Sequence, residues 1–142
     1  MKNLILMALL PLLLVACGVS AVETPQVPNP AIGKLVGQEY YLSEVVYPGG
    51  TSFEPKPNDF TFTIKSPTQM FGRTQCYQFE AETLWGESGT LTLSNNKKRA
   101  EKCDTALITF EDEMEYIIAG RYIVLRSKKS TWRTATFELV GE

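Results

Sequence analysis

The sequence Phe60-Thr61-Phe62-Thr63-Ile64-Lys65 alternates strictly between apolar and polar side chains. Such alternation is typical of a β-strand with one buried and one solvated face, because successive side chains of a strand point to opposite sides. The same pattern returns in residues 77–80, 90–94 and 134–139. These runs predict several short strands that bury one face each against a shared core.

Turn-forming residues lie between these runs, at Pro48-Gly49-Gly50, Pro57-Asn58-Asp59, residues 86–89 and Asn95-Asn96. Glycine, proline and asparagine favour tight reversals of the chain. Strands joined at this spacing predict a mainly β protein, a small antiparallel β-barrel or sandwich with at most one short helix. A parallel α/β fold is poorly supported.

Residues 104–118 carry two competing patterns. Their apolar residues recur at helical spacing, yet Ile108 and Phe110 also alternate as they would on a strand. We expect a short helix at residues 104–113, followed by a hairpin that turns at Ala119-Gly120.

Residues 1–17 have the features of a bacterial lipoprotein signal peptide. Lys2 precedes an apolar run over residues 4–15, and Leu14-Val15-Ala16-Cys17 resembles the lipobox, in which small residues precede an acylated cysteine. The run is too short to cross a bilayer, which needs roughly 20 apolar residues. We therefore expect residues 1–16 to be removed and Cys17 to carry fatty acyl chains such as palmitate. An ordinary secreted protein is the alternative.

The remaining chain divides into a tether and one domain. Residues 17–33 hold the lipidated cysteine and three prolines among small and polar residues, which suits an extended tether. Residues 34–142 are enough for a single domain. By resemblance to lipoproteins of Gram-negative bacteria, Gly18 favours the outer membrane over the inner membrane. The expected location is the cell envelope, with the chain held on the membrane through its lipid.

Once Cys17 carries lipid, Cys76 and Cys103 are the two cysteines left. Exported proteins fold in an oxidising compartment, so a disulfide between these two is the simplest outcome. Closing a loop of roughly 28 residues would stabilise the fold by about 3 to 4 kcal/mol. Two free thiols or a metal site are the alternatives. The absence of histidine weakens the metal site, because two cysteines supply half of a zinc coordination shell.

The residue types argue against catalysis. With no histidine, the chain lacks the commonest general base and any Ser-His or Cys-His pair. Glu80 and Glu82 could form a carboxylate pair, but on an alternating strand beside Tyr77 and Phe79 they point to solvent. We predict a protein that is not an enzyme and needs no cofactor. The acidic run over residues 111–115 could attract a cation or a basic partner, or simply form a solvated turn.

Four aromatic residues are candidates for recognition. Tyr40 and Tyr41 are adjacent on an expected strand and must point opposite ways, so one of them should be exposed or at a sheet end. Trp85 lies beside Gly86 and Trp132 lies beside Arg133. Exposed aromatic side chains near turns are common anchors in protein interfaces. A position in the core or in a lid of the barrel is the alternative for each.

A family resemblance rests on four segments. They are the aromatic-rich opening at residues 37–42, Phe-Thr-Ile at residues 62–64, the run around Cys76 at residues 70–79, and the hairpin at residues 115–125. Together they are similar to the META domain family of bacterial lipoproteins and heat-shock-inducible envelope proteins, over residues 34–127. The resemblance implies a compact β-rich domain with a role in the envelope and no assigned chemistry.

The expected function is that of a non-catalytic envelope lipoprotein that contacts another envelope or surface protein or supports the envelope under stress. A lipocalin-like barrel that binds a small apolar ligand is one alternative. A lipoprotein inhibitor of a hydrolase, with a protruding loop at residues 48–59, is another. The net charge of −2 and the lack of a concentrated basic face exclude nucleic acid as an expected partner.

Overall fold

The fold comes from a computed structural model that describes residues 25–100, 108–129 and 131–141. A short 3-10 helix, η1 (Pro30–Leu35), precedes nine strands in one antiparallel sheet. The strands are β1 (Glu39–Val46), β2 (Ser52–Phe53), β3 (Thr61–Ser66), β4 (Gln69–Arg73), β5 (Tyr77–Trp85), β6 (Thr90–Ala100), β7 (Glu113–Ala119), β8 (Tyr122–Ser127) and β9 (Thr134–Leu139). The predicted fold class is confirmed.

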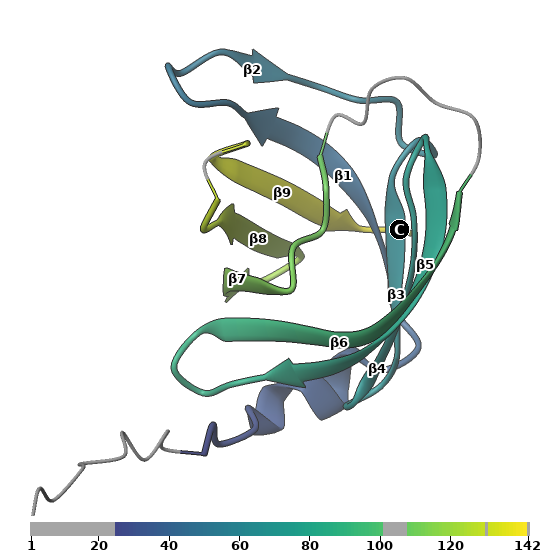
Figure 1. Ribbon diagram of the computed structural model, residues 1–142, viewed down its shortest axis with the longest axis vertical. Coiled ribbons are helices and arrows are strands. Elements are labelled where there is room, and N and C mark those ends of the chain that lie inside the picture. The colour runs from purple at the N-terminus through teal and green to yellow at the C-terminus, as the bar shows by residue number, and fades with distance from the viewer. Residues whose placement is uncertain (1–24, 101–107, 130, 142) are drawn as a thin grey trace, which may run out of the picture.

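The sheet closes into a ring because β1 pairs with other strands on both of its edges (Figure 1). One edge pairs with β9, from Tyr40↔Leu139 to Val46↔Thr134. The other edge pairs with β3 near the start of β1 and with β2 near its end. The ring consists of all the strands except β2, and each strand is antiparallel to its neighbours. This is the up-and-down arrangement of a β-barrel.

Residues 60–65 form part of the barrel wall, where every second side chain points into the interior. Phe62 and Ile64 are buried inside the ring, whereas Lys65 is exposed on the outside. Inside, Phe62 packs against Phe137 of β9 with ring centroids 4.8 Å apart. Full burial of one such side chain contributes about 1.5 to 3 kcal/mol, so the interior aromatic rings are a main source of stability.

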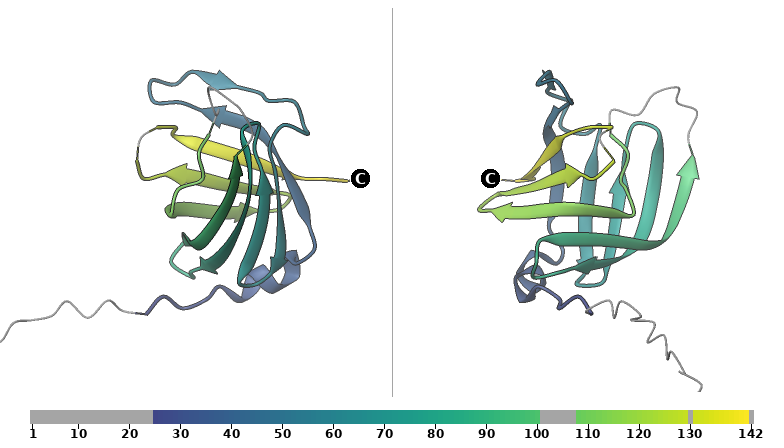
Figure 2. Two further views of the ribbon diagram at one scale, coloured as in Figure 1. Left: turned by 45° about the vertical axis from the view of Figure 1, so that its right-hand side comes forward. Right: turned by 60° about the vertical axis from the view of Figure 1, so that its left-hand side comes forward.

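The two ends of the barrel differ, as Figure 2 shows from two further sides. The helix end carries η1 together with the turns β3–β4, β5–β6 and β7–β8. The hairpin end carries β2 and the connections β4–β5 and β8–β9. Asn29 Oδ1 accepts a hydrogen bond from Ala31 N (3.0 Å) at the start of η1, and Ile32 is buried in the core. The helix is thereby fixed across its end of the ring.

Packing begins before Lys34, where the sequence placed the start of the domain. Pro28 forms an isolated antiparallel bridge with Gly86, and Asn29 N donates to Trp85 O (2.7 Å). Pro30 occupies the first turn of η1. Proline suits both the edge of a sheet and the first turn of a helix, because neither position needs its missing N–H. The sequence pattern predicts a tether for these prolines, but in the structure Pro28 and Pro30 lie in the packed fold.

The turn expected at Asn95-Asn96 is instead a β-bulge within β6. Glu80 pairs with Lys97 and Glu82 pairs with Ser94, so Ala81 alone faces both asparagines. Asn95 has φ +49°, the left-handed conformation that asparagine adopts more easily than most residues. A bulge and a turn both need such a residue, which is why the sequence pattern was ambiguous. The turns expected at residues 48–50, 57–59 and 86–89 are present.

The helix expected at residues 104–113 is wrong where the structure describes it, from residue 108 onward. Residues 108–112 form no helix, and β7 begins at Glu113. Ile108 and Phe110 are both buried. Residues two apart share a face on an extended chain but not on a helix, so an extended chain buries both. The expected hairpin is confirmed, because Ala119 pairs with Tyr122 across Gly120 and Arg121.

Candidate functional site

Three of the four candidate aromatic residues are buried in the core. Tyr40, Trp85 and Trp132 are each 1 % exposed. Tyr40 stacks on Phe62 with ring centroids 5.3 Å apart, and Trp132 Nε1 donates to the Thr109 carbonyl (3.0 Å). This burial matches the alternative expected for each of these residues, which is a position in the core rather than at the surface. None of the three can anchor a partner at the surface.

Tyr41 points to the outside of the barrel, opposite to Tyr40, as two adjacent strand residues must. Its hydroxyl donates a hydrogen bond to Glu138 Oε2 (2.8 Å). That hydrogen bond to Glu138, and then partial burial, raise the pKa of the Tyr41 hydroxyl. Arg121 lies 3.8 Å from the other oxygen of the same carboxylate. The polar atoms of this surface are therefore engaged with one another.

Residues 108–111, which we call the strap, cross the barrel at its hairpin end. The Phe110 ring lies 4.7 Å from that of Phe79, 5.9 Å from that of Phe137 and 6.4 Å from that of Phe62. These three partners belong to β5, β9 and β3. Phe110 therefore occupies the space between strands on different sides of the ring.

Hydrogen bonds hold the strap in place through the Phe110 backbone N–H and the Glu111 side chain. The buried Glu111 carboxylate accepts hydrogen bonds from the Ser127 hydroxyl and from Lys128 N (3.0 Å). Phe110 N donates to the Tyr77 hydroxyl oxygen (3.2 Å). Burial raises the pKa of Tyr77, and the hydrogen bond from Phe110 opposes this effect. Glu111 belongs to the acidic run over residues 111–115, but its carboxylate is a buried hydrogen-bond acceptor.

Two further members of that acidic run, Glu113 and Glu115, are paired with basic residues of the same chain. Glu113 contacts Lys128, and Glu115 Oε2 lies 3.4 Å from Arg126 Nη1. Within the described ranges, no group of three or more histidine, cysteine, aspartate or glutamate residues is arranged to hold a metal ion. Glu113 and Glu115 thus lie on the outer face of β7 with counter-charges on the same chain.

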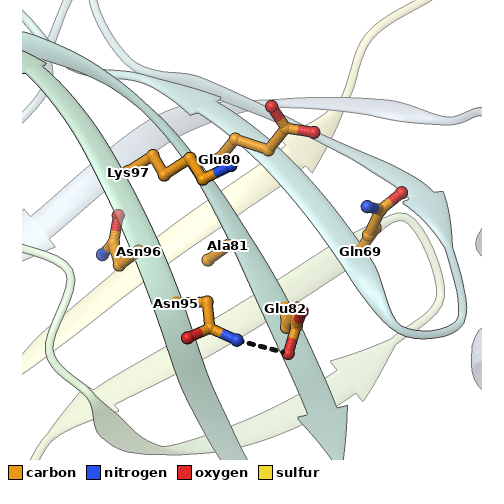
Figure 3. A pocket seen from close by; sticks show the side chains of 7 residues that line it. All are labelled: Gln69, Glu80, Ala81, Glu82, Asn95, Asn96 and Lys97. Atoms are coloured by element: carbon orange, nitrogen blue, oxygen red, sulfur yellow. Dashed lines mark hydrogen bonds between the residues drawn. The ribbon is translucent and has the colours of Figure 1, made fainter.

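Glu80 and Glu82 are exposed on the outside of β5, as the alternation predicts. They line a shallow hollow of about 440 Å³ that Gln69, Asn95 and Lys97 also border (Figure 3). Asn95 Nδ2 donates to Glu82 Oε2 (2.9 Å), which joins the bulge to the neighbouring strand. The hollow is lined by polar side chains of both charges. The hydrogen bond between Asn95 and Glu82 gives these residues a structural role.

Buried polar atoms on β5 and β6 lack a hydrogen-bond partner among the described residues. They are Thr83 Oγ1, Trp85 Nε1 and both side-chain polar atoms of Asn96. An unpaired buried donor or acceptor costs about 1 to 3 kcal/mol. These unpaired atoms lie in the wall formed by β5 and β6. No pattern in the sequence singled out these positions.

Cys76 is buried at the hairpin end, between β4 and β5, and it is disulfide-bonded. Its N–H donates to Thr74 Oγ1 (3.1 Å), so the backbone around the sulfur is also fixed. Cys103, its predicted partner, and Cys17, the predicted lipidation residue, lie outside the described residues. Both of these assignments stay predictions.

The hairpin formed by β1 and β2 exposes Phe53, which lies within residues 48–59, the loop expected to protrude in an inhibitor, but which is not one of the four candidate aromatic residues. Phe53 is 47 % exposed, and it pairs with Val45, which is buried. Paired residues share a face of the sheet, so Phe53 lies on the inner side of the sheet, beyond the end of the ring. A hollow of about 180 Å³ lined by Pro48, Arg126 and Arg133 lies at the base of the hairpin. The signal in the sequence was an aromatic residue between a Gly-Gly turn and a proline-rich segment.

Comparison with known proteins supports the fold and assigns no function. No family model matches the chain, and no curated protein matches it. The structure is similar to the NMR structure of a protein from Burkholderia xenovorans, with a TM-score of 0.55 and 18% sequence identity. The match covers 84% of this chain and 93% of that one. At this identity the likeness extends to the fold alone.

Proposed function

We propose that the chain is a non-catalytic, lipid-anchored envelope protein that binds another protein through the β1–β2 hairpin. The observation that carries this proposal is Phe53, exposed on the short strand β2 at the end of the barrel away from η1. A large aromatic side chain in such a position is typical of an interface anchor. If the partner is an enzyme, the chain acts as its inhibitor.

The surroundings of Phe53 indicate the chemistry of the partner. Arg133 N donates to Val46 O (2.7 Å), so Arg133 lies beside β1 on the side opposite to β2. Two strand spacings, about 10 Å, separate the two sides. Within the described part of the chain, the exposed Arg133 has no ion-pair partner. A partner surface with an apolar pocket and a nearby acidic group would engage Phe53 and Arg133 together.

The lipid anchor at Cys17 and the outer-membrane location belong to the same proposal. The described chain enters the barrel at the helix end, opposite to the hairpin, so an anchored barrel would leave Phe53 accessible. Among the described residues there is no helix with the length and hydropathy that a membrane span requires. The resemblance to the META domain family adds an envelope role, and its four segments fall on β1, β3, β4 to β5, and the β7–β8 hairpin.

Site-specific photocrosslinking in the bacterial host tests the proposal. A photoreactive amino acid placed at Phe53 should capture one partner, and Arg133→Glu should reduce that capture. The same amino acid placed at Ile117, which is 58 % exposed on β7, is the matched control and should not capture that partner. Equal capture at both positions, or no change with Arg133→Glu, would contradict the proposal. An assay of the captured partner for hydrolase activity then separates inhibition from other contacts.

A second candidate function is binding of a small ligand inside the barrel. It is favoured by the closed up-and-down ring, which lipocalins also use, and by the unpaired Thr83 and Trp85 atoms. Phe110 fills part of the interior, so entry would require the strap to move. Titration of the purified protein with a fatty acid, followed by tryptophan fluorescence, tests this function. A Phe110→Ala variant should bind more tightly, and no saturable signal from either protein would exclude it.

A further inference from the structure

We propose that the face formed by residues 25–37 lies against the bilayer that holds the lipid on Cys17, so that the barrel stands on its helix end. This inference rests on the lipid anchor that forms part of the proposed function. It places one surface of the domain in contact with the headgroup region of the bilayer. That contact also orients the whole domain.

The chain is bound to the barrel from Gln26 onward. Gln26 Nε2 donates to Thr90 O (3.3 Å), and Thr92 Oγ1 donates to Gln26 Oε1 (3.4 Å). Next to it, Glu87 N donates to Val27 O (2.8 Å). A Cβ atom at Gly86 would lie 2.6 Å from the Gln26 side chain, so the glycine makes room for this contact. Any tether from Cys17 therefore ends at Gln26, on the helix end of the barrel.

The length of that tether limits how the barrel can be placed. Nine Cα–Cα steps separate Cys17 from Gln26, which span at most about 30 Å in any conformation. The eight residues of β1 run from the helix end to the hairpin end and cover about 27 Å. To bring the hairpin end to the membrane, the tether would have to run back along nearly the whole barrel. A tether that is not fully extended along the barrel wall leaves the helix end nearest to the bilayer.

The surface of residues 25–37 suits this position. Its exposed side chains are small or apolar except for one lysine; they are Pro25, Val27, Pro28, Pro30, Ala31, Gly33, Lys34, Val36 and Gly37. Val27 is 59 % exposed and Val36 is 40 % exposed. Lys34 supplies a cation that would face anionic headgroups. Two exposed acidic residues border this surface: Glu39 at the start of β1, and Glu87, whose N–H donates to Val27 O.

A second apolar surface makes a different prediction. Ile117 and Tyr122 are exposed on the outside of β7 and β8, and contact with the bilayer there would lay the barrel on its side. Glu115 and Arg126 form an exposed ion pair on the same two strands, and Glu138 adds a carboxylate beside Tyr122. Bringing these charges to the bilayer would be unfavourable. Because the chain also joins the barrel at Gln26, on the helix end, we assign the membrane contact to residues 25–37.

Quenching by spin-labelled lipids distinguishes the two orientations. The full lipidated protein is purified from bacterial membranes and reconstituted into vesicles of phosphatidylethanolamine and phosphatidylglycerol. A genetically encoded fluorescent amino acid is placed at Val36, at Ile117 or at Phe53. We expect quenching by headgroup nitroxides to be roughly twofold or more stronger at Val36 than at Phe53, with Ile117 between them. Quenching that is strongest at Ile117, or equal at all three positions, would overturn the orientation.

Two controls keep this inference separable from the proposed anchor. Vesicle flotation and mass spectrometry of Cys17 report acylation alone, so a protein that does not float removes the anchor and this inference with it. A protein that floats but shows no quenching at Val36 contradicts the orientation and leaves the anchor intact. Lys34→Glu should weaken quenching at Val36, whereas the matched change Lys129→Glu at the hairpin end should not.

Discussion

The rings of Phe79 and Phe110 pack with centroids 4.7 Å apart and planes inclined by 45°. Phe79 belongs to β5, but Phe110 belongs to no strand. The strap thus supplies a side chain to the middle of the barrel from outside the ring of strands. The interior is closed at the hairpin end by a loop residue.

Phe110→Ala should be strongly destabilising. The substitution removes a fully buried ring that contacts three others, and such changes typically cost about 3 to 5 kcal/mol of unfolding free energy. Urea unfolding followed by far-ultraviolet circular dichroism measures this cost. Phe53→Ala, an exposed aromatic residue on β2, should change it by less than about 0.5 kcal/mol. Similar losses in both variants would show that the strap does not bury Phe110.

Glu111→Gln should weaken the attachment of the strap. The amide keeps the shape of the side chain, but it has one acceptor oxygen in place of the two that accept from Ser127 and Lys128 N, and its NH2 group can only donate. We expect a loss of about 1 to 3 kcal/mol. Glu113→Gln, which removes an exposed ion pair, should cost less than about 1 kcal/mol. Thermal unfolding of the two variants under one buffer condition makes the comparison.

Stability should fall at alkaline pH because of buried tyrosines. Burial raises the pKa of the Tyr40 hydroxyl above its ordinary value of 10.0, so the folded state holds the proton more tightly than the unfolded state does. This contribution is fully present below pH 10 and is lost as the pH rises through the folded pKa. Tyr40→Phe should therefore reduce the slope of unfolding free energy above pH 10. The exposed Tyr122→Phe variant serves as the control.

Asn95→Gly should preserve the bulge, and Asn95→Val should not. Asn95 has φ +49°, which a β-branched residue adopts at a cost of about 1 to 3 kcal/mol and glycine adopts freely. The glycine variant loses the hydrogen bond to Glu82 but keeps the backbone conformation. Urea unfolding of both variants separates the two effects. An equal loss in both would mean that the side-chain bond, rather than the backbone, matters at this position.

Cys76→Ser should destabilise the oxidised protein by about 3 to 4 kcal/mol, as expected for a loop of roughly 28 residues. Cys103→Ser should cause the same loss, and the double variant should lose little more than either alone. Non-reducing peptide mapping identifies the pair directly. Recovery of Cys103 as a free thiol while Cys76 stays bonded would refute the assignment.

Local patterns in the sequence predicted much of the barrel wall. The alternation in residues 60–65 identified β3 and its buried face, and the opposite directions of Tyr40 and Tyr41 followed from their adjacency. The same reasoning failed at Asn95 and in residues 108–113. At Asn95 a turn and a bulge need the same backbone conformation. In residues 108–113 a helical pattern coincided with an extended one.

The sequence by itself determined which residues alternate, where most turns occur and which residue types are available for chemistry. The tertiary structure alone decided that the ring closes through β1 and β9, that Trp85 and Trp132 are buried, and that Phe110 lies at the centre. Periodicity is a property of neighbours along the chain. Ser43 and Thr136 hydrogen-bond across 93 positions, and such contacts form because the two strands bury complementary apolar faces together. No local pattern contains that information.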